Sequence, residues 1–136
     1  MAADTLTALA ERVEGLTGPC RETDKAIALA LGWTTEAPPR DSDRPMPHLW
    51  VGPDGSREMA SPPHWTGSLD AVVALIEREL PGALWYVDRG PVRPMAGLQA
   101  AGDGPPWFFY AATPALALLA ATLRALARKE GLDGHR

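Results

Sequence analysis

The chain has 136 residues and a formal net charge of −4, with acidic and basic residues mixed along its length. A chain of this length buries enough surface to fold as one domain without disulfides or metal ions. The sequence has no stripe of basic residues that could neutralise a run of phosphates, so we expect no binding to duplex nucleic acid. The sequence contains no run of about 18 apolar residues, which is the length that a helix needs to span a bilayer. The first residues lack the basic start of a secretory signal, so a cytoplasmic protein is expected.

Two helices are predicted at the start of the chain. Over residues 4–18 the apolar side chains recur at helical spacing, at Leu6, Leu9, Val13 and Leu16. Gly18 and Pro19 end this helix, and Pro19 is suited to the first turn of a second helix, where its missing N–H is harmless. Gly32 is a natural end for the second helix.

A proline-rich segment and a hairpin follow. Residues 34–47 hold four prolines among charged side chains, so this segment is predicted to be a long loop. Residues 48–51 are typical of a short strand, and Arg57 begins the returning strand. The sequence Pro-Asp-Gly at 53–55 predicts the turn between them, because proline presets φ and glycine supplies a positive φ.

A helix in the middle of the chain has the clearest apolar stripe. Thr66 or Ser68 can cap it, and the stripe consists of Leu69, Val72, Val73, Ile76 and Leu80. Three short apolar runs then alternate with glycine and proline clusters, at residues 83–88, 95–100 and 107–111. This pattern favours a meander of three strands.

The last predicted helix begins with Thr113 as N-cap and Pro114 as its first residue, and it ends near Gly131. Its leucines form one stripe at positions 116, 119, 123 and 126. Leu118 extends the apolar face beyond that stripe, so the helix is also suited to pack against a second copy of itself. A homodimer through this helix is therefore one expectation.

The predicted order of elements is roughly ααββαβββα. Groups of strands separated by helices are typical of an antiparallel sheet covered by helices. We therefore expect one α+β domain over residues 1–136, with a small antiparallel sheet sandwiched by about four helices and a proline-rich loop at about 34–47.

Four stretches together resemble a known family. They are GPCRETDKAIALALGW at 18–33, WVGPDG at 50–55, TGSLDAVVAL at 66–75 and AATPALALLAATLRA at 111–125. In order and spacing they resemble the phage ABA sandwich domain, a family of small accessory proteins of phages and prophages. The resemblance implies helices layered against a sheet and a role in a bacterial host. The segments 36–47 and 90–94 depart from the family pattern, so a specific activity, if this chain has one, is expected in these loops.

Five tryptophans in a small domain are the main candidates for a binding site. Most tryptophans serve as core anchors, because each indole buries a large area. Alternatively, two or three of them line a cleft with arginine and histidine, which would suit a planar anionic ligand or the face of a partner protein. The candidate binding residues are Trp33, Trp50, Arg57, His64, Trp65 and Arg89.

No catalytic, cofactor or metal motif is apparent. The histidines at 48, 64 and 135 do not share a helical spacing suited to a metal, and Cys20 has no paired cysteine. Cys20 also has no base that the sequence can connect to it. Asp24 and Asp70 lie in first turns of helices, where a carboxylate is stabilised by exposed N–H groups. We therefore expect no cofactor, no bound metal and no enzymatic activity.

Two functions remain as hypotheses. The first is a non-enzymatic phage accessory protein that binds a host protein, such as a component of antiviral defence, and inhibits it by steric occlusion. The second is an oligomeric sponge that sequesters a small nucleotide signal between aromatic and arginine side chains. An exposed apolar patch would favour the protein partner, and a concave pocket with arginines would favour the ligand.

Overall fold

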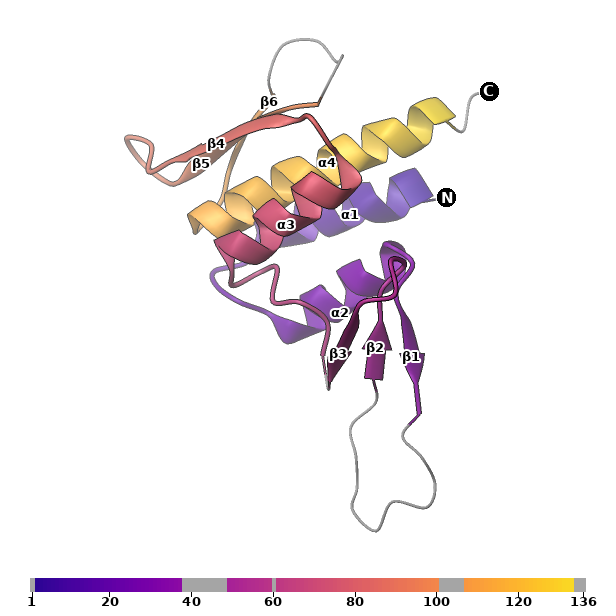
Figure 1. The fold of residues 1–136 in the computed structure, drawn as a ribbon. Helices are drawn as coiled ribbons and strands as arrows, with labels where there is room; N and C mark the ends of the chain where they lie inside the picture. The colour runs from indigo at the N-terminus through magenta and orange to yellow at the C-terminus, as the bar shows by residue number, and fades with distance from the viewer. Residues whose placement is uncertain (1, 38–48, 60, 101–106, 134–136) are drawn as a thin grey trace.

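The computed structural model describes residues 2–37, 49–59, 61–100 and 107–133. Figure 1 shows an α+β fold, as predicted, with helices and two small antiparallel sheets. The helices are α1 (Ala2–Glu14), α2 (Arg21–Ala30), α3 (Leu69–Glu79) and α4 (Pro114–Asp133). The strands are β1 (Thr34–Glu36), β2 (Leu49–Val51), β3 (Arg57–Met59), β4 (Leu84–Asp88), β5 (Met95–Gln99) and β6 (Trp107–Tyr110).

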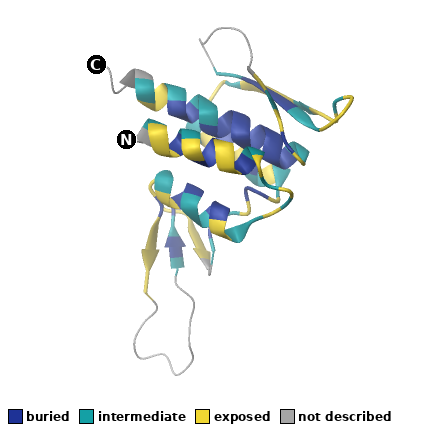
Figure 2. Cartoon of the chain, turned by 180° about the vertical axis from the view of Figure 1, so that it is seen from behind, coloured by how far each residue is buried: buried dark blue, intermediate teal, exposed yellow. Residues whose placement is uncertain are grey.

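Helix α4 is the centre of the core. It lies along α1 and also contacts α3 and the strands β4 to β6. Every residue from Ala115 to Leu123 is buried, which matches a sequence that is apolar around the whole helix (Figure 2). Leu118 is fully buried inside the monomer. The apolar surface on which a dimer through this helix was expected is therefore part of the core.

The strands form two sheets, where the sequence suggested one. Sheet A has the order β1-β2-β3, and sheet B has the order β4-β5-β6. Sheet B lies over α4, whereas sheet A extends from the end of the molecule that contains α2 (Figure 1). Helix α3 connects the two sheets in the chain, so each sheet is a separate meander of neighbouring strands.

The predicted loop at 34–47 begins later than expected. Its first residues form β1, which pairs with β2 through Thr35 opposite Trp50. All of β1 is exposed, so backbone pairing rather than burial holds this edge strand, and β-branched threonines suit it. Residues 38–47 lie outside the described part of the chain.

The starts of α3 and α4 follow the predictions, whereas α2 and the end of α4 differ. The Ser68 hydroxyl accepts a hydrogen bond from the Ala71 N–H at 3.2 Å, and the Thr113 hydroxyl accepts one from the Leu116 N–H at 3.1 Å. Pro19 is not in the first turn of α2, because the helix begins only after Cys20. Gly131 lies inside α4 and does not end it.

Candidate functional site

The three candidate tryptophans are core residues. Trp33, Trp50 and Trp65 are 3%, 8% and 1% exposed. The rings of Trp33 and Trp65 pack edge to face with centroids 5.9 Å apart. Trp33 also lies against Gly52 in the hairpin turn, where an added Cβ would be 3.1 Å from the indole. The tryptophans therefore join sheet A to the rest of the domain and offer little ring surface to a ligand.

The candidate arginines and histidine are exposed, and the two arginines belong to different sheets. Arg57 is on β3 and pairs with Glu36 of β1 at 4.0 Å, while Arg89 follows β4 on the other sheet. His64 is exposed beside the buried Trp65. Among the described residues, Arg78 of α3 lies over an indole, 6.0 Å from the Trp33 ring centroid, and it pairs with Asp54 at 3.4 Å. The sequence did not single out this contact.

A buried polar cluster links α2 to residues 62–66. The Asp24 carboxylate is 1% exposed, accepts the Thr66 N–H at 2.8 Å and pairs with Arg21 at 2.6 Å. Arg21 also donates to the Pro62 carbonyl at 3.0 Å. Burial raises the pKa of Asp24, although the hydrogen bonds from Thr66 and the charge of Arg21 oppose this shift. The carboxylate thus connects two segments far apart in sequence, beyond the helix-start role expected for it.

Cys20 belongs to the same structural cluster. Its N–H donates to the Thr66 hydroxyl at 2.8 Å, and its sulfur accepts the Thr23 hydroxyl at 3.1 Å. The Thr23 hydrogen bond lowers the pKa of the Cys20 thiol. These contacts hold the start of α2 in place.

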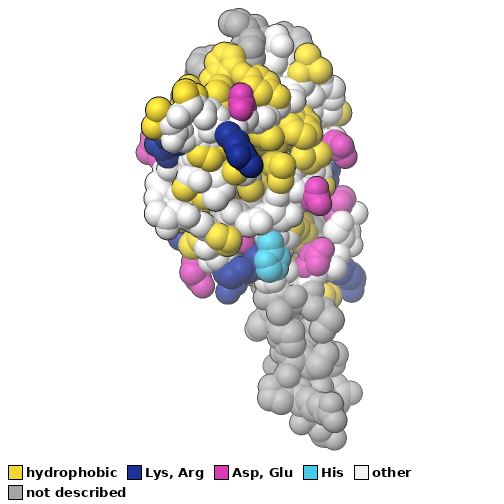
Figure 3. Space-filling view, turned by 90° about the vertical axis from the view of Figure 1, so that its left-hand side faces the viewer, with side chains coloured by type: hydrophobic (Ala, Val, Ile, Leu, Met, Phe, Trp, Pro, Cys, Tyr) yellow, Lys and Arg dark blue, Asp and Glu magenta, His cyan; other side chains and the backbone are white. Residues whose placement is uncertain are grey.

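The outer face of sheet B exposes four large apolar side chains, Leu84, Tyr86, Phe108 and Tyr110, on the same face as Asp88, Met95 and Gln99. Because side chains alternate along a strand, these four lie on the face of the sheet opposite to Ala96, Leu98 and Phe109, which pack against the core. Leu84 is 70% exposed and the three aromatic residues are 43% to 49% exposed. In the space-filling view hydrophobic side chains gather over the upper half of the molecule, where sheet B lies (Figure 3).

A glycine in the central strand shapes this outer face. Gly97 of β5 lies between Tyr86 of β4 and Phe108 of β6 in the register of the sheet. The Tyr86 ring covers Gly97, and it meets the Phe108 ring at an angle of 64° with centroids 6.0 Å apart. The absence of a side chain at Gly97 lets the two aromatic rings approach each other across the strand.

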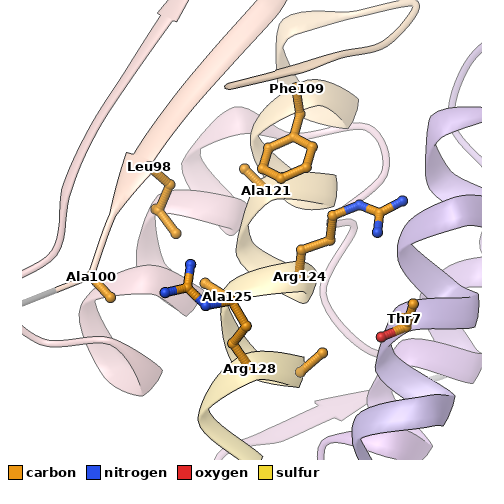
Figure 4. A pocket seen from close by; sticks show the side chains of 9 residues that line it. Thr7, Leu98, Ala100, Phe109, Ala121, Arg124, Ala125 and Arg128 are labelled. Carbon is orange, nitrogen blue, oxygen red and sulfur yellow. The ribbon is translucent and has the colours of Figure 1, made fainter. Parts of the chain in front are cut away.

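On its inner side sheet B borders a cavity of about 300 Å³. Figure 4 shows the lining side chains, which come from α1, α4 and sheet B. They are Thr7, Leu98, Ala100, Phe109, Ala121, Arg124, Ala125, Ala127 and Arg128. The cavity therefore combines apolar walls with two arginines. None of the six residues predicted as a binding site lines it.

Comparison with known proteins does not add to these observations. No family model matches the chain, and no curated protein or solved structure shows significant similarity to it. Among the described helices, none has both the length and the apolar character needed to cross a bilayer. Within the described ranges, no three histidine, cysteine, aspartate or glutamate side chains converge to form a metal site.

Proposed function

We propose that this chain is a non-enzymatic accessory binding protein of a phage or prophage, which acts in the cytoplasm of a bacterial host. It binds a host protein through the outer face of sheet B and inhibits it by covering a functional surface. A component of antiviral defence is the target class that suits such a protein. The observation that carries the proposal is the exposure of Leu84, Tyr86, Phe108 and Tyr110 on one side of one sheet.

The composition of the outer face supports a protein partner. Three of the four large apolar side chains that this face exposes are aromatic, and aromatic residues are enriched among the residues that dominate binding energy in interfaces. Contiguous exposed apolar patches on a monomer often mark interaction sites. Each square ångström of apolar surface removed from water contributes about 25 cal/mol. A partner that covers these rings thus gains hydrophobic stabilisation without a deep pocket.

Sequestration of a small nucleotide is the second candidate. Arg124 and Arg128 in the inner cavity support it, because they supply positive charge beside an aromatic ring. The three tryptophans named as binding candidates, Trp33, Trp50 and Trp65, are buried in the core and are not available to stack on a base. The cavity lining has one uncharged polar side chain, Thr7, to pair with the edge of a base. The exposed sheet face is therefore the stronger support, and it favours a protein partner.

Affinity capture from host lysate with matched variants tests the proposal. The double variant Phe108→Ser/Tyr110→Ser removes two rings from the outer face and leaves the Tyr86 contact with Gly97 in place. The control is Leu29→Ser, which removes a 60% exposed apolar side chain from α2. We expect the wild type and the control to retain the same host protein and the double variant to lose it. Equal capture by all three proteins would contradict the proposal.

A further inference from the structure

Strand β4 lies at the edge of sheet B but has the sequence of a central strand. It pairs with β5 on one side, and on its other side no strand among the described residues pairs with it. The strand contains four consecutive apolar or aromatic residues, Leu84, Trp85, Tyr86 and Val87. Continuous runs of this kind are typical of strands that are covered on both faces. The position of β4 therefore leaves more apolar surface open than its sequence suits.

Both faces of β4 remain exposed. Leu84 and Tyr86 lie on the outer face and are 70% and 43% exposed. Trp85 lies on the inner face beside Leu98 of β5, and it is 37% exposed although Leu98 is 3% exposed. The inner side of the sheet is thus covered at its central strand and open at β4. A strand added beside β4 would cover the free side of both faces, whereas a partner on the outer face alone would leave Trp85 in water.

The backbone of β4 is also available along its free edge. In an antiparallel strand every second residue directs its N–H and C=O away from the neighbouring strand. Apart from the pairing with β5, no backbone hydrogen bond within the described residues involves residues 84–88. Lysine, proline and bulges commonly protect an edge. None of them occurs in β4, whose register with β5 is continuous from Leu84 to Asp88. The edge can therefore accept another strand.

A second copy of β4 fits this edge in one register. Two identical antiparallel strands related by a twofold axis place one residue opposite itself, and all five residues of β4 pair only when this residue is Tyr86. Trp85 then lies opposite Val87 of the second copy, and the two Tyr86 rings are neighbours. Aromatic and β-branched pairs of this kind stabilise sheets. Asp88 lies opposite Leu84, so its charge does not meet the same charge of the other copy.

We propose that the chain forms a homodimer through β4, in which the two copies of sheet B join into one continuous antiparallel sheet. Backbone hydrogen bonds between the two β4 strands and the side-chain pairs on both faces hold the dimer together. The added strand lies beside β4 and not over it, so the outer face of sheet B stays accessible. The dimer is therefore independent of the proposed protein contact, and it presents that face twice on the same side.

Light scattering over a concentration series up to about 1 mM measures the association. We expect the mass to rise from that of one chain to that of two. Val87→Lys places a charge that the dimer must bury opposite Trp85, so it should weaken association at least about tenfold. The matched control Val92→Lys adds the same charge at a 92% exposed position between β4 and β5 and should associate as the wild type does. A mass of one chain throughout, or unchanged association of a folded Val87→Lys variant, would overturn the inference.

Disulfide formation tests the register and does not depend on the folding of Val87→Lys. Directly opposite residues have Cα atoms about 4.5–5.5 Å apart, which a disulfide can span. Leu84→Cys and Asp88→Cys, both at exposed positions, should form a mixed disulfide when the two proteins are combined and oxidised. Neither variant should form this bridge alone, because its two cysteines would lie about 14 Å apart along the strands.

The wild type, oxidised in the same way, reports any bridge through its own Cys20. Absence of the mixed disulfide, or as much bridged dimer from either variant alone, would contradict the pairing of β4 with its copy.

Discussion

The ring of Tyr86 lies over Gly97, its partner on the neighbouring strand, in the space that a side chain at that position would occupy. A Cβ at Gly97 would be 2.8 Å from Cζ of Tyr86. Real Cβ atoms essentially never lie so close to another heavy atom. The same ring packs against Phe108. The exposed aromatic face of sheet B is therefore built around a glycine of its central strand.

Gly97→Ala should destabilise the protein by about 1–3 kcal/mol, because the added methyl group forces the Tyr86 ring off the strand. The matched control is Gly131→Ala in α4, where nothing lies within 4 Å of the new Cβ. Since alanine is the better helix former, the control should be stabilised by up to about 1 kcal/mol. Urea unfolding followed by circular dichroism measures both. Equal stability of wild type and Gly97→Ala would contradict the contact.

Asp24→Ala should destabilise the fold by about 2–3 kcal/mol. The change leaves the buried Thr66 N–H without its acceptor and removes the carboxylate that pairs with Arg21. Asp24→Asn keeps an oxygen for the Thr66 N–H, so the loss should be smaller. Glu22→Ala removes an exposed carboxylate from the same helix, 3.7 Å from Lys25, and should change the free energy of unfolding by less than about 0.5 kcal/mol. If Glu22→Ala lowered the free energy of unfolding as much as Asp24→Ala, the result would argue against the buried cluster.

The stability of the protein should also depend on pH through Asp24. Burial raises the pKa of this carboxyl above its ordinary value of about 3.9. The folded state then holds the proton more tightly than the unfolded state does. The contribution of this bound proton to the free energy of unfolding is fully present below the ordinary pKa of the carboxyl. It is lost as pH rises through the raised pKa of the folded state. The free energy of unfolding of the wild type minus that of Asp24→Asn, measured by urea unfolding from pH 3.5 upward, should fall with pH. A rise would show that Arg21 and Thr66 outweigh burial.

Trp65→Ala should cost about 3–5 kcal/mol, because it removes a 1% exposed indole that packs against Trp33. His64→Ala, at the exposed neighbouring position, should change stability by less than about 0.5 kcal/mol. Thermal and urea unfolding measure the stability of both variants. The comparison is between a core residue and the surface residue next to it in the sequence. Similar stability of both variants would be inconsistent with Trp65 as a core anchor.

The features that could be predicted from the sequence are those with a local cause. The caps at Ser68 and Thr113 depend on residues three positions away, and the turn at Gly55, which has φ 89°, depends on its own backbone. The buried role of Asp24 depends on Thr66, 42 positions away, so its neighbours in sequence do not indicate it. The pairing of β1 with β2 likewise spans the proline-rich segment.

The outer face of sheet B illustrates why candidate sites were harder to predict than elements. In β4 both the outward residues, Leu84 and Tyr86, and the inward residue Val87 are apolar, so the strand has no alternation that marks one side as exposed. The inner cavity depends on the crossing of α1, α4 and sheet B, and no spacing within one element reveals it.

Photo-crosslinking from the outer face tests the central claim most directly. The residue p-benzoylphenylalanine is placed at Phe108 in one protein and at Leu29 in another, and each is irradiated in host lysate and analysed by mass spectrometry. The account predicts an adduct with one host protein from position 108 and none from position 29. Adducts only between two copies of this chain, equal adducts from both positions, or no adduct from position 108 would contradict a host protein on the outer face of sheet B.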